Sequence, residues 1–364
     1  MATISFQPVV NYPAGSGPVF LTAANFRNNG ILDLAITNIA SNNVTFLPNN
    51  GDGTFGLGIN YAAGTGPFCI VSADFNGDGN LDLAVANQSS DDVTLLMGDG
   101  SGVFASPVSY PAGDGPCGIV SAFFTASGNL DLAVANIFSG DIAVLPGNGD
   151  GTFAGALSTV LPSSNPIELV TADFNGDGNM DLTVSLSNSG NIAVLLGNGL
   201  GGFPTITTYS VGTTPRGIAT ADFNSDGNLD LAVANLSSNN ISILFGDGIG
   251  GFTSTPGIVL SPTSTPFQLV AADFDGDGNL DLAVTDFNNN SVIVLPGNGD
   301  GTFGTPVSFT VGSSPTGIIA ADLNNDGKPD LAVANQGGNV SILINNSILK
   351  PVRGIKLFRN TFFL

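Results

Sequence analysis

The stretch Ala-Asp-Phe-Asn-Gly-Asp-Gly-Asn-Leu-Asp-Leu-Ala-Val-Ala-Asn, residues 73–87, decides the fold because it recurs along the whole chain. Copies of it, with variations, begin at Ala24, Ala122, Ala172, Ala221, Ala272 and Ala321. Consecutive copies are 49 to 51 residues apart, and the seven units cover nearly all of the 364 residues. A fixed period of this length is typical of repeat architectures, and it leaves no room for an ordinary second domain.

Each unit shows the pattern of four short strands and no helical period. In the second unit we expect strands at 70–73, at 81–86 and at 93–97, and a fourth that begins near Phe104 and ends at the Gly-x-x-Pro corner at 113–116. In 81–86, Leu81, Leu83 and Val85 alternate with small residues, as in a β-strand. Four antiparallel strands repeated seven times predict an all-β fold, a seven-bladed β-propeller.

The two ends of the repeat region predict how the ring closes. The last unit stops after its third strand, at about 340–344, whereas residues 6–12 match the fourth strand of the other units. The N-terminal strand is therefore expected to complete the last blade, which removes an open sheet edge. A linear β-solenoid is the alternative fold, but its two ends do not meet, so it would not require one repeat to be divided between the ends of the chain. The predicted propeller domain is 1–347, followed by a basic and apolar tail at 348–364.

Oxygen-bearing side chains alternate with other residues in the first half of the repeat. Asp74, Asn76, Asp78 and Asp82 take positions 1, 3, 5 and 9 of a short loop, and the backbone carbonyl of Asn80 lies at position 7. Such a loop can surround a cation that prefers six to eight oxygens, and a flexible cage of this kind suits Ca²⁺ better than Mg²⁺. The loop is similar to the first part of an EF-hand loop. An EF-hand loop has a glutamate ligand at position 12, but here that position is a valine and a strand follows. Asp82 is therefore expected to complete the coordination shell of the ion.

Five of the seven loops keep this pattern, so the sequence predicts about five Ca²⁺ sites. The residues of these predicted sites are Asp74, Asn76, Asp78, Asn80, Asp82, Asp173, Asn175, Asp177, Asn179, Asp181, Asp222, Asn224, Asp226, Asn228, Asp230, Asp273, Asp275, Asp277, Asn279, Asp281, Asp322, Asn324, Asp326, Lys328 and Asp330. They include sixteen of the 29 acidic residues, whose crowded charges bound ions would offset. Asx-rich turns without metal are the alternative, which five copies in one register disfavour.

Two loops lack the pattern. The first unit has Asn25, Arg27 and Asn29 at positions 1, 3 and 5, and the third unit has Phe123, Thr125 and Ser127. Arg27 places a positive charge where the ion would lie. We expect it to replace the ion by a salt bridge to Asp33.

Composition excludes several classes of function. Twenty-nine acidic and seven basic residues give a net charge of −22, which argues against nucleic-acid binding. The absence of histidine excludes catalytic triads that use an imidazole base and zinc sites with histidine ligands, so we expect no enzyme activity. No apolar run is long enough to span a bilayer. The segment that starts at Met1 lacks the features of a signal peptide. Either a leader has been removed, or the signal for export does not lie at the N-terminus.

The repeats resemble FG-GAP or VCBS repeats, the unit of the integrin alpha-chain head propeller and of a group of propeller lectins. The pairs Phe55-Gly56 and Phe303-Gly304, the Gly-x-x-Pro corners and the Asp-x-Asn-x-Asp-Gly-x-x-Asp loops carry this resemblance over residues 4–347. It implies loops that bind Ca²⁺, an extracellular or cell-surface location, and binding of a protein or a glycan. Polysaccharide-degrading enzymes also occur in the family, but the missing histidine makes that reading less attractive here.

Variation among the repeats suggests where a ligand binds. The two residues after each corner proline differ widely between units and are expected to ring the mouth of the central channel. The candidate ligand-binding residues are Phe68, Glu168, Arg216 and Phe267 at this mouth, with Phe138 and Phe287 in nearby loops. The alternative is that these positions vary because the rim tolerates substitution and binds nothing. Cys69 and Cys117, in neighbouring blades, are expected to be free and partly buried rather than joined by a disulfide.

The function predicted from these features is a calcium-stabilised extracellular module that binds a glycan or a protein. A building block of a surface layer or filament is the alternative. The tail bears on that alternative, since it carries four of the seven basic residues and the apolar residues Phe358, Phe362, Phe363 and Leu364. We expect it to dock on its own propeller or on a neighbouring subunit. A junction to a further domain, or a remnant, is the other interpretation of the tail.

Overall fold

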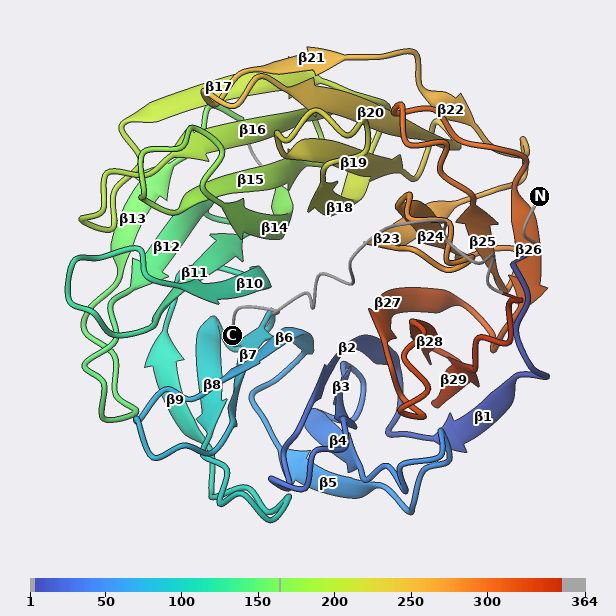
Figure 1. Ribbon diagram of the computed structural model, residues 1–364. Coiled ribbons are helices and arrows are strands. Elements are labelled where there is room, and N and C mark those ends of the chain that lie inside the picture. Colours follow the sequence, from blue (N-terminus) through green and yellow to red (C-terminus); the bar gives the residue numbers. More distant parts are fainter. Residues whose placement is uncertain (1–3, 164, 349–364) are drawn as a thin grey trace.

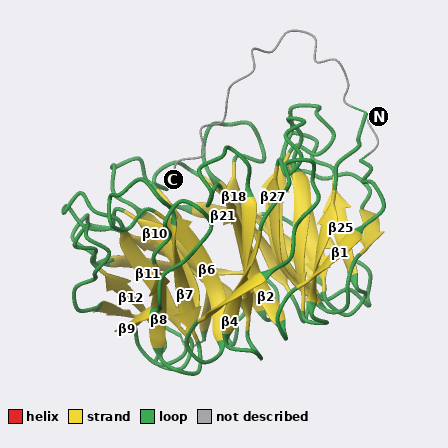
Figure 2. Ribbon diagram, turned by 90° about the horizontal axis from the view of Figure 1, so that it is seen from below, coloured by secondary structure: helices red, strands yellow, loops and turns green. Residues whose placement is uncertain are grey.

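Seven antiparallel sheets, six with four strands and one with five, form a closed ring around a central channel (Figure 1). The computed structural model describes residues 4–163 and 165–348, and within these ranges it contains no helix. The predicted all-β, seven-bladed propeller is therefore confirmed. In a side view the strands lie between two layers of loops, one at each end of the ring (Figure 2).

The blades are numbered along the chain, and their strands run from the channel outward. Blade 1 contains β2 (Pro18–Ala24), β3 (Asp33–Asn38), β4 (Asn43–Leu47) and β5 (Ile59–Ala62). Blade 2 contains β6 (Pro67–Ala73), β7 (Asp82–Asn87), β8 (Asp92–Leu96) and β9 (Val108–Pro111). Blade 3 contains β10 (Pro116–Ala122), β11 (Asp131–Asn136), β12 (Asp141–Leu145) and β13 (Leu157–Val160). Blade 4 contains β14 (Pro166–Ala172), β15 (Asp181–Leu186), β16 (Asn191–Leu196) and β17 (Thr205–Ser210).

The remaining three blades follow the same plan with two variations. Blade 5 contains β18 (Pro215–Ala221), β19 (Asp230–Asn235), β20 (Asn240–Gly246) and β21 (Phe252–Ser254), and β22 (Ile258–Val259) also pairs with β20. Blade 6 contains β23 (Pro266–Ala272), β24 (Asp281–Asp286), β25 (Ser291–Leu295) and β26 (Val307–Thr310). Blade 7 contains β27 (Pro315–Ala321), β28 (Asp330–Asn335), β29 (Asn339–Leu343) and β1 (Val10–Pro13).

The second strand of each blade lies in the middle of the core. In β7, Leu83, Ala84, Val85 and Ala86 are fully buried, and Leu83 pairs with Leu96 of β8. Because successive side chains point to opposite faces, the leucine and valine pack on one neighbouring blade while the alanines face the other. Small residues on one face let adjacent blades approach closely, which explains the Leu-Ala-Val-Ala pattern of the repeat.

Aromatic clusters join neighbouring blades. Phe153 of blade 3 packs edge-on against Phe75 and Tyr110 of blade 2, at centroid distances of 5.7 and 5.3 Å. The Tyr110 hydroxyl also donates to the backbone carbonyl of Gly151, at 3.2 Å. Tyr61 and Phe104 repeat this contact between blades 1 and 2. The recurring phenylalanines and tyrosines of the repeat thus serve blade packing.

The N-terminal strand closes the ring as predicted. β1 pairs with β29 from Val10 opposite Ile342 to Pro13 opposite Asn339, and Phe6 forms an isolated bridge with Asn345. The Phe6 ring also packs against Phe309, with ring centroids 4.9 Å apart. The first and last units therefore share one sheet, in which the outer strand comes from the start of the chain.

Two further expectations concern the cysteines and the tail. Cys69 and Cys117 are free and buried, as expected, and more deeply than the partial burial predicted. The Cys117 thiol accepts a hydrogen bond from the Gln88 side chain. The predicted tail lies outside the described residues except for Ile348, so its docking stays a prediction.

Candidate functional site

The acidic loops hold their side-chain oxygens with backbone N–H groups. In blade 2, Asp74 Oδ1 accepts from Gly77 N at 2.7 Å and Asp78 N at 3.2 Å, and Oδ2 accepts from Gly79 N at 2.9 Å. Asn76 Oδ1 accepts from Asp78 N at 2.9 Å. Corresponding bonds to the first aspartate recur in the loops that begin at Asp173, Asp222, Asp273 and Asp322. The five loops thus share one backbone turn, held by the carboxylate at position 1.

The aspartate at position 9 ties two strands of the blade together. Asp82 is fully buried, and its two carboxylate oxygens accept from Phe75 N at 3.0 Å and Gly98 N at 2.8 Å. A carboxylate offers about four acceptor positions, so these bonds leave capacity for a cation. In the third unit, which lacks the acidic pattern, Asp131 also accepts from Gly147 N, which corresponds to Gly98 N, and from Thr125 N, one residue later than the donor in blade 2. The position-9 aspartate therefore has a structural role that the sequence analysis did not foresee.

Burial and charge crowding act on the same carboxylates. Loss of solvent raises the pKa of Asp82 to about 6 and that of Asp281 to about 7, and repulsion from the other loop aspartates adds to the increase. The backbone hydrogen bonds lower the pKa of both groups but do not offset the burial. A bound cation would favour the charged form, so these buried carboxylates suit a metal site.

Blade 6 has the densest acidic loop. Asp273, Asp275 and Asp281 offer carboxylate oxygens that all lie within 4.8 Å of one another. This loop carries aspartate at position 3, where the other four intact loops have asparagine. All-oxygen donors at this spacing fit a hard divalent cation.

The loop of blade 1 contains a positive charge of its own. Arg27 Nη2 lies 2.7 Å from Asp33 Oδ1, and Arg27 Nε donates to both carboxylate oxygens at 3.0 Å. It is the only ion pair within the described residues, and it confirms the predicted salt bridge. Arg27 occupies the position of Asn76 in the repeat, so the chain supplies a cation in one of the two loops that lack the acidic pattern.

At the opposite end of the channel, the predicted collar is filled rather than open. Phe68, Glu168 and Phe267 are each 8% exposed, and with Phe20, Arg216 and Gln268 they leave no cavity large enough for a water molecule. We call these six residues the channel plug. The inner strands converge at the channel, so side chains that vary between repeats pack against one another there. This burial differs from the accessible mouth that the sequence analysis expected.

The channel plug contains both charged and aromatic contacts. Gln268 Nε2 donates to Glu168 Oε1 at 2.9 Å, and the Arg216 guanidinium lies 4.8 Å from the centroid of Phe267. Burial raises the pKa of Glu168 to about 7, although the hydrogen bond and the arginine charge lower it. The remaining two candidates lie further out. Phe287 stacks on Phe267 and is half-buried, whereas Phe138 is 69% exposed.

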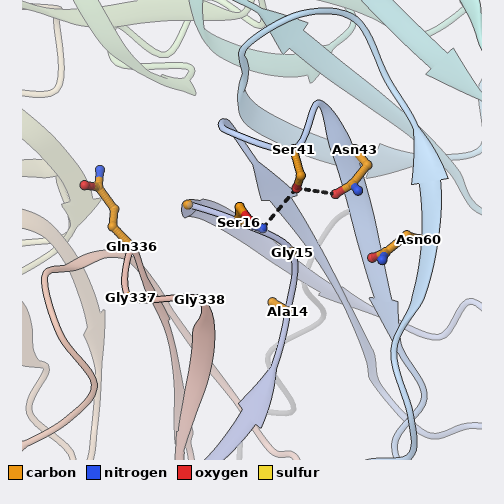
Figure 3. Close-up of a pocket in the computed structure, with 10 residues that line it drawn as sticks. Ala14, Gly15, Ser16, Ser41, Asn43, Asn60, Gln336, Gly337 and Gly338 are labelled. Atoms are coloured by element: carbon orange, nitrogen blue, oxygen red, sulfur yellow. Dashed lines mark hydrogen bonds between the residues drawn. The ribbon is translucent and has the colours of Figure 1, made fainter.

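A polar groove lies on the same face, at the seam between blades 7 and 1. This seam groove has a volume of about 560 Å³ and is lined by Ala14, Gly15, Ser16, Gly17, Ser41, Asn43, Asn60, Gln336, Gly337 and Gly338. Figure 3 shows Gln336 on one side and Ser16, Ser41, Asn43 and Asn60 on the other. Ser41 accepts from Ser16 N at 3.0 Å and donates to Asn43 Oδ1 at 3.1 Å. The lining is therefore rich in amides and hydroxyls and carries no charged side chain.

The seam groove was not predicted from the sequence, although a signal for it exists. In blade 7 the turn between the second and third strands, 336–338, is one residue shorter than the turn 88–91 of blade 2, and it contains two glycines. A Cβ at Gly338 would meet only the carbonyl oxygen of Gly15, at 3.9 Å, so this wall of the groove is open. The shorter turn thus leaves space that longer turns fill elsewhere.

Comparison with known proteins identifies the family. A model described as FG-GAP-like repeat matches residues 25–85, 74–122, 124–184, 173–233, 222–284 and 273–333. The chain belongs to the FG-GAP-like repeat family. The matched segments begin 49 to 51 residues apart, which is the period of the repeat described above, and the predicted resemblance is confirmed. No curated protein matches the chain in sequence.

Solved structures share the fold at low identity. A streptogramin B lyase is 17% identical over 93% of this chain and 98% of its own, with a TM-score of 0.66. BBS1N in complex with ARL6DN is 13% identical over 94% and 97%, with a TM-score of 0.67. An Agrocybe aegerita lectin specific for non-reducing terminal N-acetylglucosamine is 17% identical over 91% and 86%, with a TM-score of 0.59. At these identities the likeness concerns the propeller fold alone.

Proposed function

We propose that this FG-GAP-like propeller is a calcium-stabilised module that binds a glycan outside the cell or at its surface. The observation that carries the calcium part is the repetition of one oxygen-rich loop in five blades. Asp, Asn and backbone oxygens at positions 1, 3, 5, 7 and 9 would hold each ion, so Lys328 at position 7 would contribute its carbonyl. Bound ions would supply positive charge and rigidity, not chemistry.

The Arg27–Asp33 pair supports this part of the proposal. In blade 1, where carboxylates at positions 1 and 5 are missing, a guanidinium lies against the buried aspartate at position 9, whereas in blade 3 the corresponding Asp131 accepts from backbone N–H groups. A positive partner lowers the cost of keeping a buried carboxylate charged. In the five intact loops a divalent cation would take that role.

The seam groove is the proposed glycan site. Sugar hydroxyls bind side-chain amides and hydroxyls, and Gln336, Asn60 and Ser16 present such groups around an open, uncharged groove. The similarity to a fungal lectin is consistent with a glycan ligand, although it concerns the fold alone. The exposed Phe138 instead favours a protein ligand on the same face, which is the second candidate.

We further propose that the protein is not an enzyme. A structural relative from Staphylococcus aureus, virginiamycin B lyase, is described as catalytically inactive when one histidine is replaced by alanine. This chain has no histidine, so that chemistry has no equivalent residue here. Among the described residues, no helix has the length and apolar character to cross a membrane. A role as a building block of a surface layer stays a prediction.

A glycan array with two matched variants tests the proposal. Gln336→Ala removes a side chain from the seam groove, whereas Gln88→Ala removes the same residue type from the corresponding turn of blade 2, which does not line the groove. We expect Gln336→Ala to lower glycan binding at least tenfold and Gln88→Ala to preserve it. Binding that is absent in the parent, or equal in the three proteins, would exclude a glycan site in the seam groove.

A further inference from the structure

A second cavity lies inside the channel, at the acidic-loop end. It has a volume of about 720 Å³ and is lined by the channel side of β2, β6 and β27 and by the loops of blades 7, 1 and 2. The channel plug lies at the opposite ends of the inner strands and leaves no water-sized space there. This channel cavity is therefore a hollow on one side of the channel, filled at the plug end and open at the acidic-loop end, and its volume is in the size range of small-molecule sites.

The lining of the channel cavity is mainly apolar. Leu32, Leu81 and Ile319 contribute the larger side chains, and alanines of β2 and β27 form much of the remaining wall. Two hydroxyl groups interrupt this surface. The Thr22 and Ser72 oxygens lie 3.2 Å apart, within hydrogen-bond distance of each other. A ligand that fills this cavity must therefore present an apolar body.

The mouth of the channel cavity carries amides and a carboxylate. Asn25 and Asn28 come from the loop of blade 1, and Asp322 comes from the adjacent acidic loop of blade 7. No lysine or arginine lines the cavity, and the nearby Arg27 is paired with Asp33. In a chain with a net charge of −22, this mouth favours a positive group and disfavours an anion.

We propose that the channel cavity binds a small cationic amphiphile, whose apolar body fills the cavity and whose positive head lies at the mouth beside Asp322. This site is separate from the seam groove, and it shares only Asp322 with the predicted metal sites, so the probe is titrated on metal-free protein. The combination of an apolar wall and a few polar groups at one end is what orients a ligand in such a site.

The internal repeats provide a matched pair of variants. Ser72 and Ser121 both occupy the sequence Ile-Val-Ser-Ala, on β6 and β10, and both are half-buried. Ser72 lines the channel cavity and Ser121 does not. Ser72→Leu therefore reduces the cavity, while Ser121→Leu places the same side chain at the same strand position elsewhere.

Fluorescence titration with two naphthalene probes tests the proposal. The chain has no tryptophan, so the probe signal can be read directly. We expect saturable binding of one 2-naphthylmethylammonium per chain, at least tenfold weaker for Ser72→Leu and unchanged for Ser121→Leu. Naphthalene-2-sulfonate, with the opposite charge, should bind at least tenfold more weakly than the ammonium probe.

Three results would overturn the proposal. They are no saturable binding of the ammonium probe, equal weakening by the two leucine substitutions, and equal affinity for the two probes. Melting of each variant checks folding. If Ser72→Leu does not fold, Ala320→Leu, which also lines the cavity, is compared with Ala271→Leu at the same strand position in blade 6. The same tenfold weakening and the same unchanged control are then required.

Discussion

Single side chains in this propeller combine structural and functional roles. Asp82 joins the loop after β6 to the turn after β8 through two backbone N–H groups, and it also faces the acidic loop. Asp131 also joins its loop to the following turn through two backbone N–H groups, although its loop lacks acidic residues at positions 1, 3 and 5 and the loop donor is one residue later. The two roles can therefore be separated. The position-9 aspartate stabilises the blade through its backbone hydrogen bonds, and the residues at positions 1, 3 and 5 would determine whether an ion binds.

Substitution at position 5 is therefore expected to affect one ion and little else. Asp78→Ala removes a predicted ligand in blade 2 without touching the structural bonds of Asp82. Calorimetric titration of metal-free protein with Ca²⁺ should give four sites in place of five. Ser127→Ala, in the loop of blade 3 that lacks the pattern, is the control and should keep five. A count that Asp78→Ala leaves unchanged would exclude this loop as a calcium site.

Glu168 in the channel plug is expected to make stability depend on pH. Burial raises its pKa from 4.5 to about 7 in the folded protein, so folding favours the protonated form. Its contribution to stability is fully present below about pH 4.5 and is lost as the pH rises through about 7. That loss corresponds to about 3 kcal/mol.

Denaturation of Glu168→Gln at several pH values measures this contribution. The variant keeps an oxygen that can accept from Gln268 but cannot ionise. Its free energy of unfolding should exceed that of the parent by about 3 kcal/mol more at pH 8 than at pH 4. A difference between the two proteins that stays constant with pH would show that Glu168 does not titrate as described.

At the scale of strands and turns, β1 determines whether the ring is closed. Phe6 lies just before β1 and contacts Phe274 and Phe309, which couples the N-terminal segment to blade 6, and its bridge with Asn345 joins that segment to the last unit. Phe6→Ala should lower the free energy of unfolding by about 2 to 3 kcal/mol, since the ring is only partly buried. Val10→Ala on β1, where the side chain is 50% exposed, should change it by less than about 0.5 kcal/mol. Equal effects in urea denaturation would contradict this account of closure.

The sequence predicts strands and closure well because both follow from local patterns. Alternation in residues 81–86 and the split repeat each require only neighbouring residues or a comparison of units. The channel plug was harder to predict, since variation at Phe68 and Glu168 looks the same for an exposed rim and for side chains that meet across a channel. The seam groove depends on a turn one residue shorter in blade 7, and its effect appears only when blade 1 is placed beside it.

Charge is the dominant property of the whole molecule. The net charge of −22 includes five acidic loops at one end of the ring, and repulsion among them opposes folding unless cations are bound. Four of the seven basic residues lie in 350–359, in the predicted tail outside the described residues. The complementary charges of the propeller and the tail are the reason to expect that the tail docks.

Deletion of residues 349–364 tests whether the tail drives assembly. If the tail docks on a neighbouring subunit, light scattering should give an oligomer for the full chain and a monomer of lower mass for the truncated chain. Raising the salt concentration should favour the monomer, because it screens the charges. Monomers for both chains at low salt would exclude assembly through the tail.

The central claim, that calcium stabilises this propeller, is tested most directly by thermal melting with saturating Ca²⁺ and with EDTA. Each ion that binds only the folded state adds about 2.7 kcal/mol at a hundredfold excess over its dissociation constant. With about five sites, the melting midpoint in Ca²⁺ should lie well above that in EDTA, and Mg²⁺ at the same concentration should stabilise less. An unchanged midpoint after removal of calcium would contradict the claim.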